Sequence, residues 1–141
     1  IDLFKEFCDF LDKTPFLKNP SILQYLLKKE KDKPEKSDNV QSTLSRYAHS
    51  KDFLAFIHNR IMEHKAKKDE MRRPYVFLHG IGSMYPYLRV NEFLALYEDF
   101  NRTNEYKIIV FYPGNREENS YKLFHVLHDS NTYRATLLIN E

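Results

Sequence analysis

The spacing of apolar residues changes at about residue 74. Before it, apolar residues recur three and four positions apart, as on one face of an α-helix, in four stretches near residues 2–14, 20–27, 40–47 and 51–64. After it, compact apolar runs that end in turn residues alternate with further helical stretches. We predict strands at YVFLHG (75–80), KIIVFYPG (107–114) and YRATLLIN (133–140), and helices at 86–100 and 120–127.

Residues that favour helix ends and loops support these boundaries. Asp2 and Ser50 can cap the first and fourth helices, and Asn19 followed by Pro20 can begin the second. Residues 28–39 read KKEKDKPEKSDN, a charged stretch that a proline interrupts and that has no apolar periodicity. We predict that this stretch is a surface loop.

The alternation of strands and helices after residue 74 indicates the fold class. Such alternation implies parallel strands that are joined by helical crossovers. We therefore predict an α/β fold with a mostly parallel sheet and helices on both faces, a three-layer sandwich. Residues 1–141 would form a single α/β domain, in which 1–73 are mainly helical and 74–141 run strand-helix-strand-helix-strand. Because helical sequence begins almost at Ile1, we also expect an N-terminal portion to be missing.

Composition and charge narrow the classes of function. The 22 Lys and Arg residues against 20 Asp and Glu give a net charge of +2, which is not the strongly basic balance of a nucleic-acid-binding domain. A local basic run at 65–73 leaves DNA contact as an unsupported alternative. We find no apolar run of about 18 residues and no signal segment. The single cysteine, Cys8, fits a reducing compartment, so we predict a cytoplasmic protein without membrane contact.

The loops that follow the first two predicted strands are the best candidates for a functional site. In open α/β sheets, ligands usually bind beyond the carboxyl ends of the strands. All three glycines of the chain fall in these loops, at Gly80, Gly82 and Gly114. Tight turns alone would explain glycine there, because glycine permits backbone conformations that other residues avoid.

These loops contain no complete catalytic motif. Gly80–Ser83 before a helix could supply backbone N–H groups to a phosphate, but the Lys and hydroxyl residue of a P-loop are missing and Tyr85 stands where a dinucleotide fingerprint has its third glycine. No Gly-x-Ser-x-Gly nucleophile turn is present. The histidines offer one short group of metal-ligand types, His125, His128 and Asp129, without further ligands. We predict no catalytic residue, no metal and no cofactor, which leans against an enzyme.

Four segments in the second half together resemble a known family. They read FLHGIGSMYPYLR (77–89), IIVFYPG (108–114), KLF (122–124) and YRATLLI (133–139). In this order they are similar to the C-terminal half of the BrxB family of bacterial BREX phage-defence systems, long catalogued as a domain of unknown function. The N-terminal half matches only loosely, and the family normally carries a further upstream segment. Thr132 departs from the family pattern, where many relatives have a second tyrosine, which weakens any role for paired aromatic residues there.

The resemblance implies a component of a BREX assembly that contacts other BREX proteins, above all PglZ, the alkaline-phosphatase-like component. We therefore predict a non-catalytic scaffold or adaptor. The alternative is a degenerate nucleotide-binding regulatory protein that uses the Gly80–Ser83 loop. Tyr and Arg side chains often dominate interface energies. The residues predicted to bind a partner or ligand lie in the strand-end loops and near the C-terminus: Gly80, Gly82, Ser83, Tyr85, Pro86, Arg89, Tyr112, Pro113, Gly114, Tyr133 and Arg134.

Overall fold

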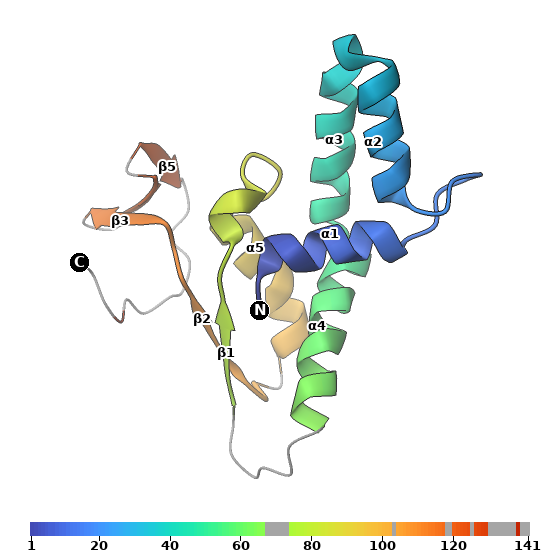
Figure 1. The fold of residues 1–141 in the computed structure, drawn as a ribbon. Helices are drawn as coiled ribbons and strands as arrows, with labels where there is room; N and C mark the ends of the chain where they lie inside the picture. Colours follow the sequence, from blue (N-terminus) through green and yellow to red (C-terminus); the bar gives the residue numbers. More distant parts are fainter. Residues whose placement is uncertain (67–73, 103, 118–119, 125, 130–137, 139–141) are drawn as a thin grey trace.

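Among the described residues the structure is a mixed α/β arrangement in which four α-helices are followed by a strand, a fifth α-helix and four further strands. This computed structural model describes residues 1–66, 74–102, 104–117, 120–124, 126–129 and 138 (Figure 1). The α-helices are α1 (Leu3–Lys13), α2 (Ile22–Asp32), α3 (Ser37–Ala48), α4 (Lys51–Ala66) and α5 (Val90–Tyr97), and the 3-10 turns are η1 (Pro34–Lys36), η2 (Ile81–Met84) and η3 (Glu98–Asn101). The strands are β1 (Tyr75–Leu78), β2 (Lys107–Val110), β3 (Gly114–Glu117), β4 (Ser120–Leu123) and β5 (Leu127–Asp129).

The first and fourth helices begin where their caps predict. The Asp2 carboxylate accepts a hydrogen bond from the Lys5 N–H at 3.1 Å, which satisfies one of the free donors at the start of α1. The Ser50 hydroxyl accepts the Phe53 N–H at 3.2 Å at the start of α4. Both helices bury one face in the core, so the prediction from apolar spacing is confirmed for them.

The region between α1 and α4 is more helical than predicted. Helix α2 is capped by Ser21, whose hydroxyl accepts the Gln24 N–H at 3.2 Å, so the predicted cap at Asn19 is wrong. The predicted surface loop at 28–39 is also wrong for most of its length, because α2 continues to Asp32 and α3 begins at Ser37. Lys and Glu have high helix propensity, and this outweighs the absence of apolar periodicity. Helices α2 and α3 form a hairpin that projects from the rest of the molecule (Figure 1).

Strands β1 and β2 pair in parallel, as predicted, with α5 between them in the chain. The register places Tyr75 opposite Lys107 and Leu78 opposite Val110. The start of the chain runs along the other side of β1 in the same direction, where the Leu3 N–H donates to the His79 carbonyl at 2.9 Å and the His79 N–H donates to the Ile1 carbonyl at 3.0 Å. Strand β1 therefore lies between β2 and residues 1–3.

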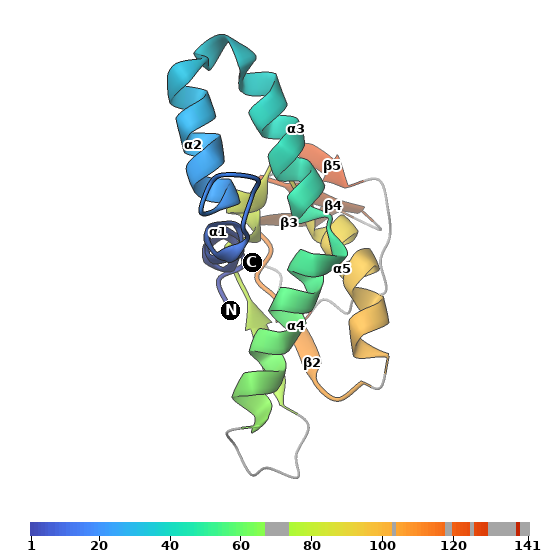
Figure 2. The same cartoon turned by 90° about the vertical axis from the view of Figure 1, so that its right-hand side faces the viewer.

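Helices cover one side of this parallel pair. In both views α1, α4 and α5 lie on the same side of β1 and β2 (Figure 2). Val76, Leu78, Ile108 and Val110 point to that side and pack with the core, whereas Tyr75 and Phe77 on the opposite face are exposed. The described residues therefore do not show a mostly parallel sheet with helices on both faces, and the predicted strand at 133–140 lies almost entirely outside them.

A second, antiparallel sheet follows β2. Strand β3 pairs with β4, and β4 pairs with β5. The predicted helix at 120–127 is wrong, because Leu123 and Leu127 lie opposite each other on adjacent strands instead of one turn apart on a helix. The predicted helix at 86–100 is shorter than expected and begins at Val90, since Arg89 is still extended (φ −101°, ψ 160°).

A polar group of aromatic residues is buried beside α4 and α5. The Tyr97 and Tyr106 hydroxyl oxygens lie 2.8 Å apart, and the Tyr106 hydroxyl lies 3.0 Å from His58 Nδ1. Burial, reinforced by the Tyr106 hydroxyl, raises the pKa of Tyr97.

Among the described helices, none combines the length and the apolar content that crossing a membrane requires.

Candidate functional site: a cleft at the strand ends

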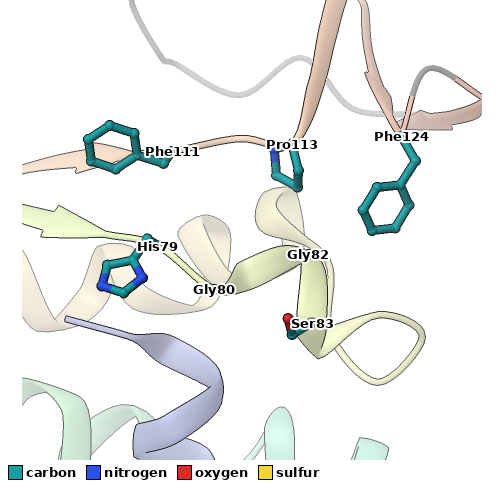
Figure 3. Close-up of a pocket in the computed structure, with 7 residues that line it drawn as sticks. All are labelled: His79, Gly80, Gly82, Ser83, Phe111, Pro113 and Phe124. Carbon is teal, nitrogen blue, oxygen red and sulfur yellow. The ribbon is translucent and has the colours of Figure 1, made fainter.

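A cleft of about 320 Å³ opens where β1 and β2 end. Its lining comes from the segment after β1, from the segment after β2 and from the residue that follows β4 (Figure 3). The lining residues are His79, Gly80, Gly82, Ser83, Phe111, Pro113 and Phe124. The carboxyl ends of neighbouring parallel strands meet at one edge of a sheet, and this is why loops about thirty residues apart in the chain face each other here.

Gly80 fixes the direction in which the chain leaves β1. Its backbone is left-handed (φ 74°), a conformation that glycine adopts without strain. A Cβ at this position would lie 2.4 Å from Asp2 Oδ1. A side chain at Gly80 would therefore strain the left-handed backbone and push aside the Asp2 carboxylate that caps α1.

Gly82 forms the floor of the cleft. A Cβ here would lie 2.7 Å from Pro113 Cγ and 3.2 Å from Phe124 Cε1. Figure 3 shows the Phe124 ring pointing toward η2, the turn that carries Gly82. The turn after β1 and the segment after β2 are therefore in direct contact, as predicted from their positions at adjacent strand ends.

An aromatic and cationic stack borders the cleft on the side of Phe124. The Tyr85 and Phe124 rings pack edge to face, with centroids 6.3 Å apart and planes at 89°. The Arg89 guanidinium carbon lies 5.8 Å from the Tyr85 ring centroid, within the range of a cation–π contact. The Arg89 N–H donates to the Glu92 carboxylate at 2.8 Å, which fixes Arg89 at the start of α5.

Gly114 joins the cleft to the antiparallel sheet. A Cβ here would lie 1.9 Å from the Lys122 carbonyl oxygen and 2.7 Å from Tyr112 Cε1. The Phe124 N–H donates to the Pro113 carbonyl at 2.8 Å, and this bond holds Phe124 against the cleft. Tyr112 packs edge to face with Tyr121 at 5.6 Å on β4.

The structure brings most of the predicted site residues together. Gly80, Gly82, Ser83 and Pro113 line the cleft. Tyr85 and Arg89 border it, Pro86 follows Tyr85 through a cis peptide bond, and Tyr112 and Gly114 lie next to Pro113. Tyr133 and Arg134 lie outside the described residues.

Three lining residues, His79, Phe111 and Phe124, were not among the predicted site residues. His79 and Phe111 stand directly at the strand ends, where the sequence already indicated a site. Phe124 lies in the predicted helix at 120–127, and that prediction is wrong. No signal in the sequence showed that the β3–β4 hairpin returns Phe124 to η2.

The chemistry of the described lining is mainly apolar. His79 and Ser83 supply its polar side chains, and in the part of the chain that the structure describes no hydrogen bond joins these two residues. The described residues contain no group of three or more His, Cys, Asp or Glu that could hold a metal ion. Cys8 lies in α1, and burial, together with the charge of Asp2, raises the pKa of its thiol and so disfavours the reactive thiolate.

This geometry describes a mixed α/β protein with a mainly apolar cleft at the ends of its parallel strands. A family model described as "BREX protein BrxB" matches residues 1–138. The chain therefore belongs to the BrxB family and is a component of a BREX defence system. The match includes the helical first half, where the sequence motifs alone showed only a loose likeness. No curated protein and no solved structure shows significant similarity to the chain.

Proposed function

We propose that the chain is a non-catalytic scaffold or adaptor of a BREX antiphage assembly, and that its strand-end cleft binds a partner protein such as PglZ. The observation that carries this proposal is the cleft with its border of Tyr85 and Arg89. Buried aromatic and Arg side chains in pockets are the usual centres of binding energy at protein interfaces. The cleft therefore suits a protruding apolar side chain of a partner.

The packing around Gly82 weighs against nucleotide as the occupant. A phosphate site needs open space in front of backbone N–H groups. Here Pro113 and Phe124 pack directly against Gly82, and η2 is only one short 3-10 turn. These contacts supply apolar surface where a phosphate needs donors.

Alanine variants of the full-length chain test the proposal. We expect Tyr85→Ala or Phe124→Ala to weaken binding of purified PglZ by about 30-fold, the effect of losing one dominant interface residue. Leu27→Ala is the matched control, because Leu27 is an exposed apolar residue on α2, away from the cleft. Affinity measured by calorimetry should not change in the control.

Two results would contradict the proposal. If Tyr85→Ala and Phe124→Ala keep native circular dichroism and full affinity for PglZ, the cleft is not the binding surface. If ATP, GTP or NAD binds the chain and Gly82→Ala abolishes that binding, the nucleotide alternative is correct.

A further inference from the structure

The face of the parallel pair that points away from the helices is apolar and exposed. We call the residues Tyr75, Phe77, Ile109 and Phe111 the outer face. Tyr75, Phe77 and Phe111 have exposed fractions of 59%, 50% and 59%, and the Phe77 and Phe111 rings lie 6.1 Å apart. Aromatic residues at such exposure form a continuous patch of the kind that marks interaction sites.

The composition of β1 and β2 is that of strands covered on both sides. Parallel strands occur almost only in sheets with both faces buried, and they then read as continuous apolar runs. Here Val76 and Leu78 fill the inner side while Tyr75 and Phe77 occupy the outer side. A helical layer is the usual cover of a parallel sheet, so the outer face has the chemistry of a site for a helix.

The size of the outer face favours a single helix over a second copy of the chain. Three aromatic side chains of about 200 Å² each, half exposed, offer on the order of 300 Å². A stable dimer needs about 800 Å² from each partner. The outer face spans four residue steps from Tyr75 to Phe111, about 13 Å along the strands, which about nine residues of α-helix cover.

We propose that the outer face binds one amphipathic α-helix of a partner protein, lying along β1 and β2. Positions i and i+4 of a helix rise by about 6 Å, close to the spacing of about 6.6 Å between Tyr75 and Phe77 along β1. Lys107, exposed opposite Tyr75, pairs with a carboxylate on the polar edge of that helix. This surface is separate from the proposed function except at Phe111, which also lines the cleft.

The test uses a panel of overlapping 20-residue peptides that covers the other proteins of the same BREX system, with binding to the full chain followed by fluorescence anisotropy. We expect the bound peptides to carry apolar residues at i, i+4 and i+7 and to become helical by circular dichroism. Phe77→Ser and the milder Phe77→Thr should weaken binding at least tenfold, and Lys107→Glu should weaken it about as much at low salt. Leu27→Ser is the matched control and should bind normally.

Each contrary result overturns the proposal. The proposal is wrong if the peptides fail to bind, if they bind as extended chains, or if they bind equally well to Phe77→Thr. The proposal is also wrong if hydroxyl-radical footprinting of the free chain shows Tyr75 and Phe77 to be protected, because a second copy or another segment of this chain would then cover the outer face. Failure of the cleft proposal looks different: Tyr85→Ala would then keep full affinity for PglZ, whereas binding of the helical peptides and its loss in Phe77→Thr would be unaffected.

Discussion

Gly114 is the position where a single methyl group should separate the antiparallel sheet from the rest of the fold. In Gly114→Ala the new Cβ would lie 1.9 Å from the Lys122 carbonyl oxygen, a backbone atom that no side-chain rotation can move. Real contacts of this kind lie beyond about 3 Å, so β3 and β4 must separate by about 1 Å. The neighbouring bond from the Phe124 N–H to the Pro113 carbonyl, 2.8 Å long, would then stretch to nearly 4 Å and be lost.

We expect Gly114→Ala to lower the free energy of unfolding by about 2 kcal/mol, the cost of forced overpacking together with lost hydrogen bonds. The core of α1, α4 and β1 should stay intact. Hydrogen exchange followed by mass spectrometry should show faster exchange in residues 112–127 and unchanged exchange in β1 and α4. Because Phe124 would then no longer be held against the cleft, we also expect PglZ binding there to be lost.

Asn115→Ala is the control for this prediction. It leaves alanine one residue further along β3 by removing atoms instead of adding one, and it deletes the Asn115 Oδ1, which is buried and has no hydrogen-bond partner among the described residues. Removing such an atom is neutral or stabilising. If Gly114→Ala exchanges no faster in 112–127 than wild type or Asn115→Ala, the close approach of β3 and β4 is not a constraint on the fold.

Three further predictions concern the core and its charges. Phe53→Ala should lower the unfolding free energy in urea titration by about 4 kcal/mol, because a fully buried ring that packs on its neighbours is removed; a loss under 1 kcal/mol would contradict this packing. The pKa of Tyr97 is raised in the folded state, so stability should fall as pH rises above about 10, where the unfolded tyrosine ionises. Tyr97→Phe should cost about 1 kcal/mol at pH 7 and flatten that alkaline decline, and an equally steep decline would refute it. The hydrogen bond from Lys13 lowers the pKa of Asp9, with help from Arg60, so the contribution of Asp9 is present above about pH 4 and is lost as pH falls through the lowered value. Asp9→Asn should cost under about 1 kcal/mol at pH 7, since the pair is exposed, and should reduce the acid dependence of the melting temperature; an unchanged acid profile would argue against the pair.

The sequence was sufficient to locate those helices and strands whose own residues determine where they begin and end. The caps at Asp2 and Ser50 located α1 and α4, and the apolar runs located β1 and β2. The predicted loop at 28–39 is wrong because a charged stretch that lacks apolar periodicity and contains a proline can still form helix on both sides of that proline. A projecting hairpin such as α2–α3 has little core to face, so its helices depend on the propensity of Lys and Glu as much as on an apolar stripe.

The antiparallel sheet could not be predicted for a different reason. Leu123, Phe124 and Leu127 have a spacing that fits a helix as well as a strand pair. Pairing with β3 decides between the two, and that pairing depends on Gly114 admitting the Lys122 carbonyl. Because the position of Phe124 depends on this pairing, the sequence did not place Phe124 in the predicted site. Gly80, Gly82 and Pro113 were predicted correctly to lie at the cleft, because their places at adjacent strand ends follow from parallel topology alone.

The two sides of β1 differ in burial within four residues. Val76 and Leu78 pack into the core, so changes to them act on stability. Tyr75 and Phe77 lie on the same strand, but their side chains remain half exposed in the isolated chain. Exposed aromatic surface lowers solubility, and the core does not need it. A variant on the outer side that binds poorly and still melts normally would therefore be evidence about a partner, because the inner residues and the pairing of β1 with β2 and residues 1–3 hold the strand in place.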